Sequence, residues 1–269
     1  MGIHPTAIID KRAKIGSENE IGPYVVIEGE VTIGNNNYIG PGTIITGNTT
    51  IGDNNQIHGH VYIGNLPQDV AFKNSRTYVI IGNNNIIREF ATIHRGTKEE
   101  SKTIIGNNNF LMVASHVAHN CILGNNIVMV NAASLGGYVE VHDHAFLGGF
   151  VIVHQFCRIG SYTMSGILTK VVKDVPPFML VDGNPAKVRG TNVVGLKRKG
   201  FNNKRREVIK KAYKILYRSG YKLSHSLEIL NNDISRLTEE DPESAKDIEM
   251  LVDFIKNSKR GIVLKSEKE

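Results

Sequence analysis

A six-residue spacing of aliphatic side chains is the feature that most limits how this chain can fold. Counting in sixes from Ile3 gives an isoleucine at every step as far as Ile63, eleven in one unbroken phase. The phase returns at Ile81 and continues, with Leu, Val or Met at some steps, to Ile159. A period of six fits neither an α-helix nor an alternating strand, and it is typical of a parallel β-helix built from hexapeptide repeats. We therefore expect short strands separated by corners, with three sextets closing one triangular coil.

The residues that follow the aliphatic positions suggest how the corners are made. Gly34, Gly82 and Gly106 each begin a Gly-Asn-Asn-Asn run directly after an isoleucine of the repeat. Glycine and asparagine both tolerate positive φ, so we expect both to serve the corners. The chain contains 27 glycines and no tryptophan, which fits a core of aliphatic side chains joined by tight turns.

The phase fails at two places, around Asp69 and Ser75 and again at Glu99. Both failures indicate loops inserted between coils, near residues 64–80 and 97–102. The alternative fold is an ordinary β-sandwich with Gly-rich turns, but its strands would not keep one register over so long a stretch. The sequence therefore favours the β-helix.

The repeat ends after Val171, and the rest of the chain has a different pattern. Pro176 and Pro177 lack the N–H groups that a strand ladder needs, so we expect the ladder to stop there and a linker to follow. From about Phe201 apolar residues recur at spacings of three and four, which predicts helices over 201–217, 227–237 and 245–255. The expected organisation is a β-helix over residues 1–190 and a helical domain over residues 191–269.

Hydropathy and charge limit where the chain works and what it binds. No apolar run approaches the roughly 18 residues of a membrane span, and the first ten residues lack the order of a signal peptide. We expect a cytoplasmic protein without stable membrane insertion.

Positive charge is concentrated between Lys197 and Lys222. Nucleic acid is disfavoured because no stacking platform or recognition motif appears, whereas a diphosphate ligand and an acidic carrier protein account for the charge. About half of the basic residues in this segment are expected to lie on a solvated helix face, with no ligand bound to them.

The 18-residue coil also predicts which side chains stack on one another. One column contains His119, Gly137 and Gln155. The neighbouring column contains Ala118, Gly136 and His154. A neutral imidazole such as that of His119 suits a general base acting on a hydroxyl, and a glycine lets a carbonyl approach a backbone N–H that can hold an oxyanion. This combination predicts acyl transfer.

A metal site is the alternative for part of this cluster. His94, His116 and His119 resemble the scattered ligands of carbonic anhydrases with hexapeptide folds. On a straight strand, His116 and His119 would point to opposite faces, and His94 is out of register with His116. We therefore expect no metal site.

Several stretches resemble the UDP-N-acetylglucosamine acyltransferases of lipid A biosynthesis, across nearly the whole chain. The matching stretches are His94-Arg95-Gly96-Thr97, His116-Val117-Ala118-His119, His154-Gln155-Phe156-Cys157, Asp174-Val175-Pro176-Pro177, Gly195-Leu196-Lys197-Arg198-Lys199-Gly200-Phe201, Ala212-Tyr213-Lys214 and Tyr217-Arg218-Ser219-Gly220. The resemblance implies a left-handed β-helix, although crossovers between parallel strands are otherwise right-handed. It also implies a homotrimer with sites between subunits, and no metal or cofactor. The implied reaction moves a 3-hydroxyacyl chain from acyl carrier protein to the 3-position of UDP-GlcNAc, the first step of lipid A biosynthesis.

The resemblance also implies roles for individual residues. His119 falls at the general base and Gly137 at the oxyanion donor. Positions that resemble substrate contacts are occupied by Asp69, His116, His154, Gln155, Asn192, Arg198 and Lys199. Ile167 and Lys170 fall where the family measures its acyl chain. Because Ile167 is bulkier than the glycine of some members, we expect a chain shorter than the fourteen-carbon type.

The sequence departs from the family pattern at four positions. Asn120 stands where an aspartate is usual, Tyr138 replaces a histidine, Val194 replaces a glutamate, and Ala71 replaces a lysine for which nearby Lys73 is a substitute. These changes leave other functions open. One is the same transfer to the 3-amino analogue of UDP-GlcNAc, which gives an amide, and another is a trimeric scaffold that binds the sugar nucleotide or carrier protein without turnover. A CoA-dependent acetyltransferase fits the repeat but not the basic helical segment.

Overall fold

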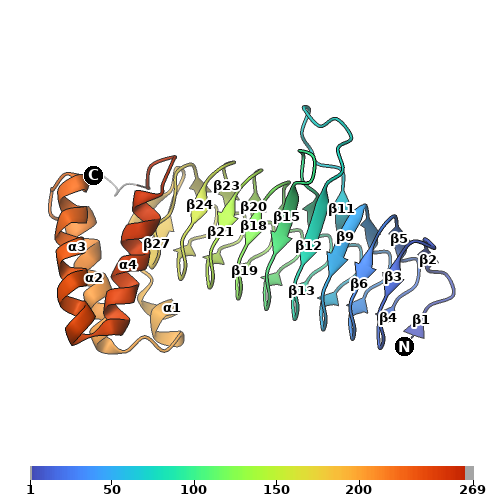
Figure 1. Ribbon diagram of the computed structural model, residues 1–269, viewed down its shortest axis with the longest axis horizontal. Coiled ribbons are helices and arrows are strands. Elements are labelled where there is room, and N and C mark those ends of the chain that lie inside the picture. Colours follow the sequence, from blue (N-terminus) through green and yellow to red (C-terminus); the bar gives the residue numbers. More distant parts are fainter. Residues whose placement is uncertain (1, 264–269) are drawn as a thin grey trace.

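The chain winds as a left-handed parallel β-helix that ends in a group of helices, as the sequence predicts. The computed structural model describes residues 2–263. Over these residues the strands form three sheets, named A, B and C, that are the faces of a triangular prism (Figure 1). Among the strands of residues 2–263, all pairs are parallel except β27 with β28.

Each sheet takes one strand from each coil. Sheet A contains, in spatial order, β1 (Gly2–Ile3), β4 (Glu20–Ile21), β7 (Tyr38–Ile39), β10 (Gln56–Ile57), β13 (Ile86–Ile87), β16 (Phe110–Leu111), β19 (Val128–Met129), β22 (Phe146–Leu147), β25 (Met164–Ser165), β27 (Met179–Asp182) and β28 (Lys187–Thr191). Sheet B contains β2 (Ile8–Ile9), β5 (Val26–Glu28), β8 (Ile44–Thr46), β11 (Tyr62–Asn65), β14 (Thr92–His94), β17 (His116–Val117), β20 (Ser134–Leu135), β23 (Ile152–Val153) and β26 (Lys170–Val171). Sheet C contains β3 (Lys14–Ile15), β6 (Thr32–Ile33), β9 (Asn48–Ile51), β12 (Tyr78–Ile81), β15 (Lys102–Ile105), β18 (Ile122–Leu123), β21 (Glu140–Val141) and β24 (Arg158–Ile159).

The inward positions are those of the six-residue repeat. Ile21 pairs with Ile39 and Ile39 with Ile57, so one coil takes 18 residues, as expected. These side chains are fully buried along the prism axis. Because burial of an isoleucine stabilises a fold by about 1.5–3 kcal/mol, the stacked repeat supplies most of the driving force for this part of the chain.

The corners use asparagine and glycine for different reasons. Asn36 and Asn54 have φ values of 55° and 58°, as expected of corner residues. Gly34 does not adopt positive φ, so the prediction for glycine was wrong at that position. A Cβ on Gly34 would instead lie 2.7 Å from the Gly52 carbonyl oxygen of the next coil. Glycine is needed there because neighbouring coils approach closely.

The two inserted loops lie at the same corner of the prism. Residues 66–77 join β11 to β12, and residues 95–101 join β14 to β15. Both connections run from sheet B to sheet C, a corner that we call the B–C corner. In Figure 1 the longer loop projects from the prism next to β11.

The ladder does not stop at the two prolines, which corrects the sequence prediction. The Val175 N–H donates to the Arg158 carbonyl oxygen at 2.8 Å, and β27 then continues sheet A alongside β25. Pro176 and Pro177 lie just before Phe178, a corner residue with φ of 70°. Both prolines lie outside the strands, and within the described residues sheet C has no strand beyond β24 to which their N–H groups would donate.

Four helices within residues 2–263 cover one end of the prism (Figure 1). α2 (Asn203–Tyr217), α3 (Leu223–Glu240) and α4 (Pro242–Lys256) confirm the three predicted helices, with α3 and α4 longer than expected, whereas α1 (Val193–Arg198) was not predicted. The division near residue 190 stays a prediction, with β28 ending at Thr191. In the described part of the chain, none of the helices combines the length and apolar character that crossing a bilayer requires.

Candidate active site

His119 lies at the B–C corner, where the chain leaves β17. The corner residue Asn120 has φ of 60°, and the His119 imidazole is largely buried, with 9% of the residue exposed. The hydroxyl-bearing ring of Tyr138, one coil further on, meets the His119 ring edge to face at 5.4 Å between centroids. The base predicted from the sequence is thus held on two sides by neighbours from its own corner.

Asn120 determines which nitrogen of His119 carries a proton. The Thr97 N–H donates to Asn120 Oδ1 at 3.1 Å, and because a backbone N–H can only donate, this atom of the amide must be the oxygen. His119 Nδ1 lies 3.1 Å from the same oxygen. Since an amide oxygen only accepts, Nδ1 carries the hydrogen and Nε2 is left as the basic nitrogen.

Two hydroxyl groups complete this network. Thr97 Oγ1 donates to Asn120 Oδ1 at 3.0 Å and lies 3.0 Å from the Tyr138 hydroxyl, which donates to it in turn. Thr97, Asn120 and Tyr138 thus form a chain of hydrogen bonds that ends at the His119 ring. Thr97 was not predicted as a site residue, although it belongs to one of the matching stretches, because it lies in an inserted loop where the repeat gives no position.

Gly137 lies directly against the imidazole. A Cβ at this residue would come within 2.6 Å of His119 Nε2, so a larger side chain would displace the ring. Among the hydrogen bonds formed by residues 2–263, none uses the Gly137 N–H as a donor. The predicted column is present, since the registers of β17, β20 and β23 stack His119, Gly137 and Gln155 in successive coils.

The longer inserted loop brings Asp69 to the same nitrogen. Asp69 Oδ2 is 3.9 Å from His119 Nε2, and Oδ1 accepts a hydrogen bond from the Ala71 N–H at 2.9 Å. The carboxylate is therefore held by its own loop on the open side of the imidazole. Lys73, the residue offered in place of a usual lysine, is exposed in the same loop.

His94 and His116 lie close enough to His119 to interact with it electrostatically. His94 is out of register with His116, as the sequence predicts, because His116 pairs with Thr92. The His94 and His116 rings meet edge to face at 5.3 Å. Burial lowers the pKa of His116, and the nearby His94 and His119 lower it further. The chain turns its corner between Val117 and Asn120, so the rule for a straight strand does not apply. Nevertheless, the described residues contain no group of three or more His, Cys, Asp or Glu side chains placed to hold a metal ion.

Burial keeps His116 neutral. Desolvation, with smaller contributions from His94 and His119, lowers the pKa of His116 to about 4. Its Nδ1 lies 2.7 Å from Thr92 Oγ1. Burial also lowers the pKa of His94, whose Nδ1 lies 2.6 Å from the Leu66 carbonyl oxygen, an acceptor, and therefore carries the hydrogen.

The outer face of sheet B connects this site to the predicted chain-length residues. His116, Ser134, Ile152 and Lys170 form one column of outward side chains. Ile167 precedes the next corner, where sheet A meets sheet B, and 69% of it is exposed. His154 and Gln155 are also exposed, at the B–C end of β23. These residues border one open surface rather than a closed pocket.

Asn192, Arg198 and Lys199 lie at another corner of the prism. Asn192 Oδ1 accepts the Gly195 N–H at 3.0 Å and caps α1, while its amide donates to the Tyr162 carbonyl oxygen at 2.9 Å. Tyr162 is the corner residue between sheets C and A. Within one chain the structure therefore does not bring these three residues together with His119.

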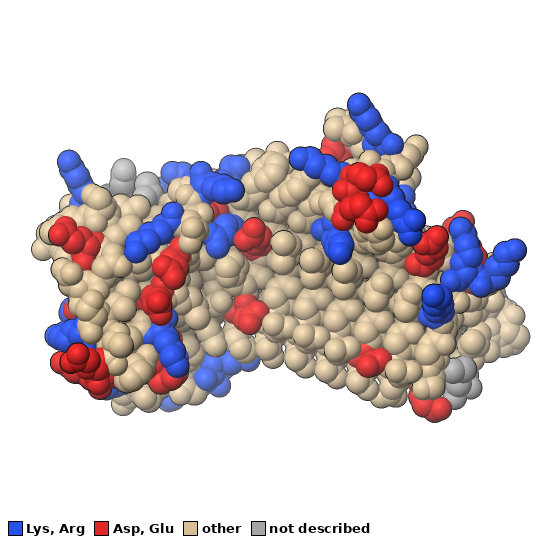
Figure 2. Space-filling model, viewed as in Figure 1, with Lys and Arg blue, Asp and Glu red and all other residues tan. Residues whose placement is uncertain are grey.

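The basic segment is partly neutralised by acidic residues that follow it. Arg205 forms a two-bond ion pair with Asp247 at 2.8 Å, Lys204 pairs with Asp241, and Lys211 pairs with Asp233. Figure 2 shows positive and negative side chains side by side over the helices. The charge is therefore less concentrated on the surface than in the sequence.

Comparison with known proteins finds relatives over nearly the whole chain. Residues 174–263 match the family model described as UDP N-acetylglucosamine O-acyltransferase, domain 2, and residues 30–65 match the bacterial transferase hexapeptide repeat. An acyl-[acyl-carrier-protein]–UDP-N-acetylglucosamine O-acyltransferase of Halorhodospira halophila is 44% identical over 97% of this chain and 98% of its own. Its counterpart from Thermodesulfovibrio yellowstonii is also 44% identical, with the same coverage.

Solved structures give the same result. The UDP-N-acetylglucosamine acyltransferase of Francisella novicida matches with a TM-score of 0.92 and 40% identity, covering 99% of this chain and 95% of that chain. The UDP-N-acetylglucosamine O-acyltransferase of Moraxella catarrhalis matches with a TM-score of 0.90 and 41% identity, covering 98% and 100%. The chain therefore belongs to the acyl-[acyl-carrier-protein]–UDP-N-acetylglucosamine O-acyltransferase family.

Proposed function

We propose that this protein transfers a 3-hydroxyacyl chain from acyl carrier protein to the 3-hydroxyl of UDP-GlcNAc, with His119 as the general base. The observation that carries the proposal is the fixed tautomer of His119. Its Nδ1–H is held by Asn120, and the basic Nε2 lies between Asp69 and Gly137. A base that is already oriented loses little entropy when the acceptor binds.

The reaction follows from these groups. Nε2 takes the proton of the sugar 3-hydroxyl while the hydroxyl oxygen attacks the thioester carbonyl carbon, and the carbonyl oxygen becomes an oxyanion near the Gly137 N–H. When the tetrahedral intermediate collapses, the carbon–sulfur bond breaks and the imidazolium returns its proton to the leaving thiolate. The products are the 3-O-acyl sugar nucleotide and the free thiol of the carrier protein. Protein groups alone carry these steps.

A homotrimer would complete the site. Exposed Phe150 (60%) and Leu168 (66%) lie on the corner between sheets A and B and would be covered around a threefold axis. Sheet B of one subunit would then face sheet A of the next. This arrangement brings the B–C corner with His119 towards the partner's opposite corner, where Asn192, Arg198 and Lys199 could meet the diphosphate.

The open face of sheet B suits the acyl chain. Ile152 and Ile167 offer exposed apolar surface there, and Lys170 ends the column. We infer that Ile167 limits the slot to chains shorter than fourteen carbons. The reaction would be the first step of lipid A biosynthesis and would take place in the cytoplasm without stable insertion into the membrane.

Mass spectrometry of reaction products tests the proposal. Purified protein is given 3-hydroxyacyl carrier-protein donors of increasing length, with UDP-GlcNAc and, separately, its 3-amino analogue. We expect an ester of UDP-GlcNAc, and a loss of about 10²- to 10⁴-fold in kcat for His119→Ala. His225→Ala, a change of the same type at an exposed position on α3, should have no effect. Near-normal activity of His119→Ala would refute the assignment of the base. If none of the donors gives a product, the alternative of a binding scaffold without turnover would be favoured.

A further inference from the structure

We propose that three copies of His60, one from each subunit, form a site for a divalent transition-metal ion such as Zn²⁺ on the threefold axis. His60 is an exposed residue of the corner where sheet A meets sheet B, between β10 and β11, which we call the A–B corner. The inference rests on the trimer of the proposed function and adds a site that takes no part in acyl transfer. This site is separate from His94, His116 and His119, which lie on sheet B and at the B–C corner.

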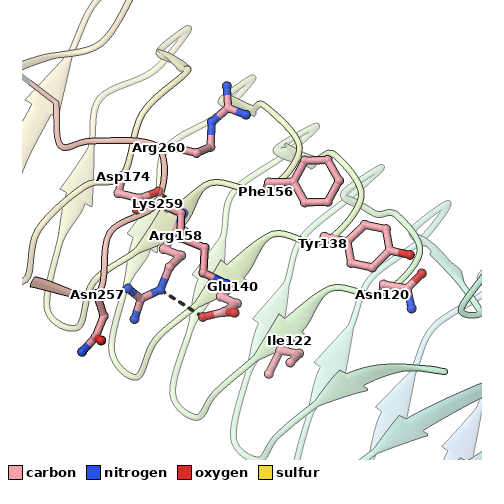
Figure 3. Close-up of a pocket in the computed structure, with 10 residues that line it drawn as sticks. All are labelled: Asn120, Ile122, Tyr138, Glu140, Phe156, Arg158, Asp174, Asn257, Lys259 and Arg260. Atoms are coloured by element: carbon pink, nitrogen blue, oxygen red, sulfur yellow. Dashed lines mark hydrogen bonds and ion pairs between the residues drawn. The ribbon is translucent and has the colours of Figure 1, made fainter. Parts of the chain in front are cut away.

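Corner residues of successive coils lie one above another along each edge of the prism. Figure 3 shows this for Tyr138 and Phe156 at the B–C corner. At the A–B corner, the registers of sheets A and B place His60 between Gly42 of the preceding coil and Phe90 of the following coil. These three residues have φ values of 55° to 66°, so they share one backbone conformation. The column therefore presents its side chains outward from one edge of the prism.

The same column carries the apolar side chains that a trimer would cover. Tyr24 is 70% exposed and Phe90 is 56% exposed, and Phe150 and Leu168 follow further along this edge. A threefold axis along the edge that covers Phe150 and Leu168 also brings the three His60 side chains towards one another. Each His60 would therefore meet its own copies from the two other subunits.

The orientation of the His60 ring suits it to bind a metal ion on that axis. The ring stacks on Phe90 with 5.6 Å between centroids and 5° between planes, so its plane lies across the prism edge and its nitrogens point sideways. Within residues 2–263, the hydrogen bonds and ion pairs made by histidine rings do not include His60. Histidine in water is mostly neutral at pH 7, and neutral imidazole is the form that binds metal ions.

Gly42 leaves room for a fourth ligand. A Cβ on Gly42 would lie 2.7 Å from His60 Nδ1 and Cε1, so the ring lies directly over a residue that has no side chain. Water can therefore reach the axis from the Gly42 side, while the Phe90 rings close the other side. Zn²⁺ and Co²⁺ with three imidazole ligands commonly hold a water in the fourth tetrahedral position. Gly42 and Phe90 are also uncharged, so neither would attract an anion to this point of the axis.

The number of zinc ions bound per trimer tests the inference. Full-length protein is freed of metal with a chelator, sedimented to measure its mass, dialysed against zinc chloride, and analysed for zinc by mass spectrometry. We expect about one zinc ion per three chains for the wild type and a loss of at least about tenfold for His60→Phe. Phe90 and Phe150 already adopt positive φ at this corner, so His60→Phe should keep the trimer and its turnover. His225→Phe, the same change at an exposed position on α3, is the matched control and should retain the zinc.

Three results would overturn the inference. Zinc bound once per chain would indicate a site within one subunit, zinc retained by a His60→Phe trimer would place the ion elsewhere, and a wild-type trimer without zinc would show that the imidazoles do not converge. Zinc content does not depend on turnover. A protein that binds one zinc per trimer through His60 but transfers no acyl chain would refute the proposed function alone, whereas a monomeric wild type would refute both the shared site and this inference.

Discussion

The amide oxygen of Asn120 accepts hydrogen bonds from the Thr97 backbone, the Thr97 hydroxyl and the His119 ring. This one atom orients the His119 imidazole, the proposed base, without a negative charge. A carboxylate at this position would also stabilise the imidazolium that forms during the reaction, whereas an amide cannot. We infer that the hydroxyl chain from Tyr138 partly compensates, because each donor that polarises Oδ1 holds the ring more firmly.

The Thr97 hydroxyl should therefore matter for turnover and not for substrate binding. Thr97→Val keeps the backbone N–H and the shape of the side chain but removes the link between Asn120 and Tyr138. We expect kcat to fall about three- to tenfold, the cost of one hydrogen bond of about 1 kcal/mol, with KM for both substrates unchanged. Thr97→Ser restores the hydroxyl and should restore kcat. A change in KM alone would show that Thr97 contacts substrate.

His116 should make the fold sensitive to acid. Its pKa is about 4 in the folded protein and near 6.5 when exposed, so the unfolded chain binds an extra proton between these values. Stability should consequently fall as pH is lowered from about 6.5 to about 4, by roughly 3 kcal/mol at most. Denaturant unfolding at several pH values measures this, and His116→Gln should flatten the decline over that range. An unchanged slope in the variant would assign the acid sensitivity to other groups.

At the scale of elements, the asparagines hold successive coils together. Asn19, Asn37, Asn55, Asn85 and Asn109 are buried one above another at the corner between sheets C and A. Asn55 Nδ2 donates to Asn37 Oδ1 at 3.0 Å and to the Gly82 carbonyl oxygen at 3.0 Å, and Asn55 Oδ1 accepts from Asn85. Each amide thus satisfies buried backbone groups that the corner leaves unpaired.

Removing one amide from this ladder should be costly. Asn55→Ala leaves the Gly82 carbonyl oxygen and the Asn85 backbone N–H without their partner and removes one of the two donors to Asn37 Oδ1, so we expect a loss of about 3 kcal/mol of unfolding free energy. Asn54→Gly, at the neighbouring exposed corner position with φ of 58°, should change stability by less than about 0.5 kcal/mol. Denaturant unfolding measures both losses. Equal losses would show that the positive-φ conformation of the corner, and not the buried ladder of amides, accounts for the stability.

At the scale of the molecule, the residues of the proposed site are divided between two corners of the prism. His119 lies where sheet B meets sheet C, and Asn192 lies where sheet C meets sheet A. A single chain therefore holds the base and the basic residues apart, which is the strongest reason to expect a trimer.

Disrupting the A–B corner should disrupt assembly without unfolding the chain. Phe150 has φ of 55° and is exposed, and aspartate tolerates that conformation. We expect wild-type protein to sediment at three times the chain mass, and Phe150→Asp to sediment as smaller species and lose activity. Asn126→Asp, at the corner between sheets C and A, is the matched control and should remain trimeric. A monomeric wild-type protein with full activity would rule out a shared site.

The periodicity alone was enough to predict the prism and its columns. A six-residue period repeated along Ile3–Ile63 and Ile81–Ile159 leaves only one way to bury the isoleucines, and the strand ladder then stacks His119, Gly137 and Gln155 in register. The surroundings of the His119 imidazole, by contrast, could be seen only in the folded chain. Asp69 and Thr97 come from loops that break the period, and the cations of α2 pair with α3 and α4. These contacts join segments far apart in the chain through irregular backbone, and a local period carries no information about where such segments meet.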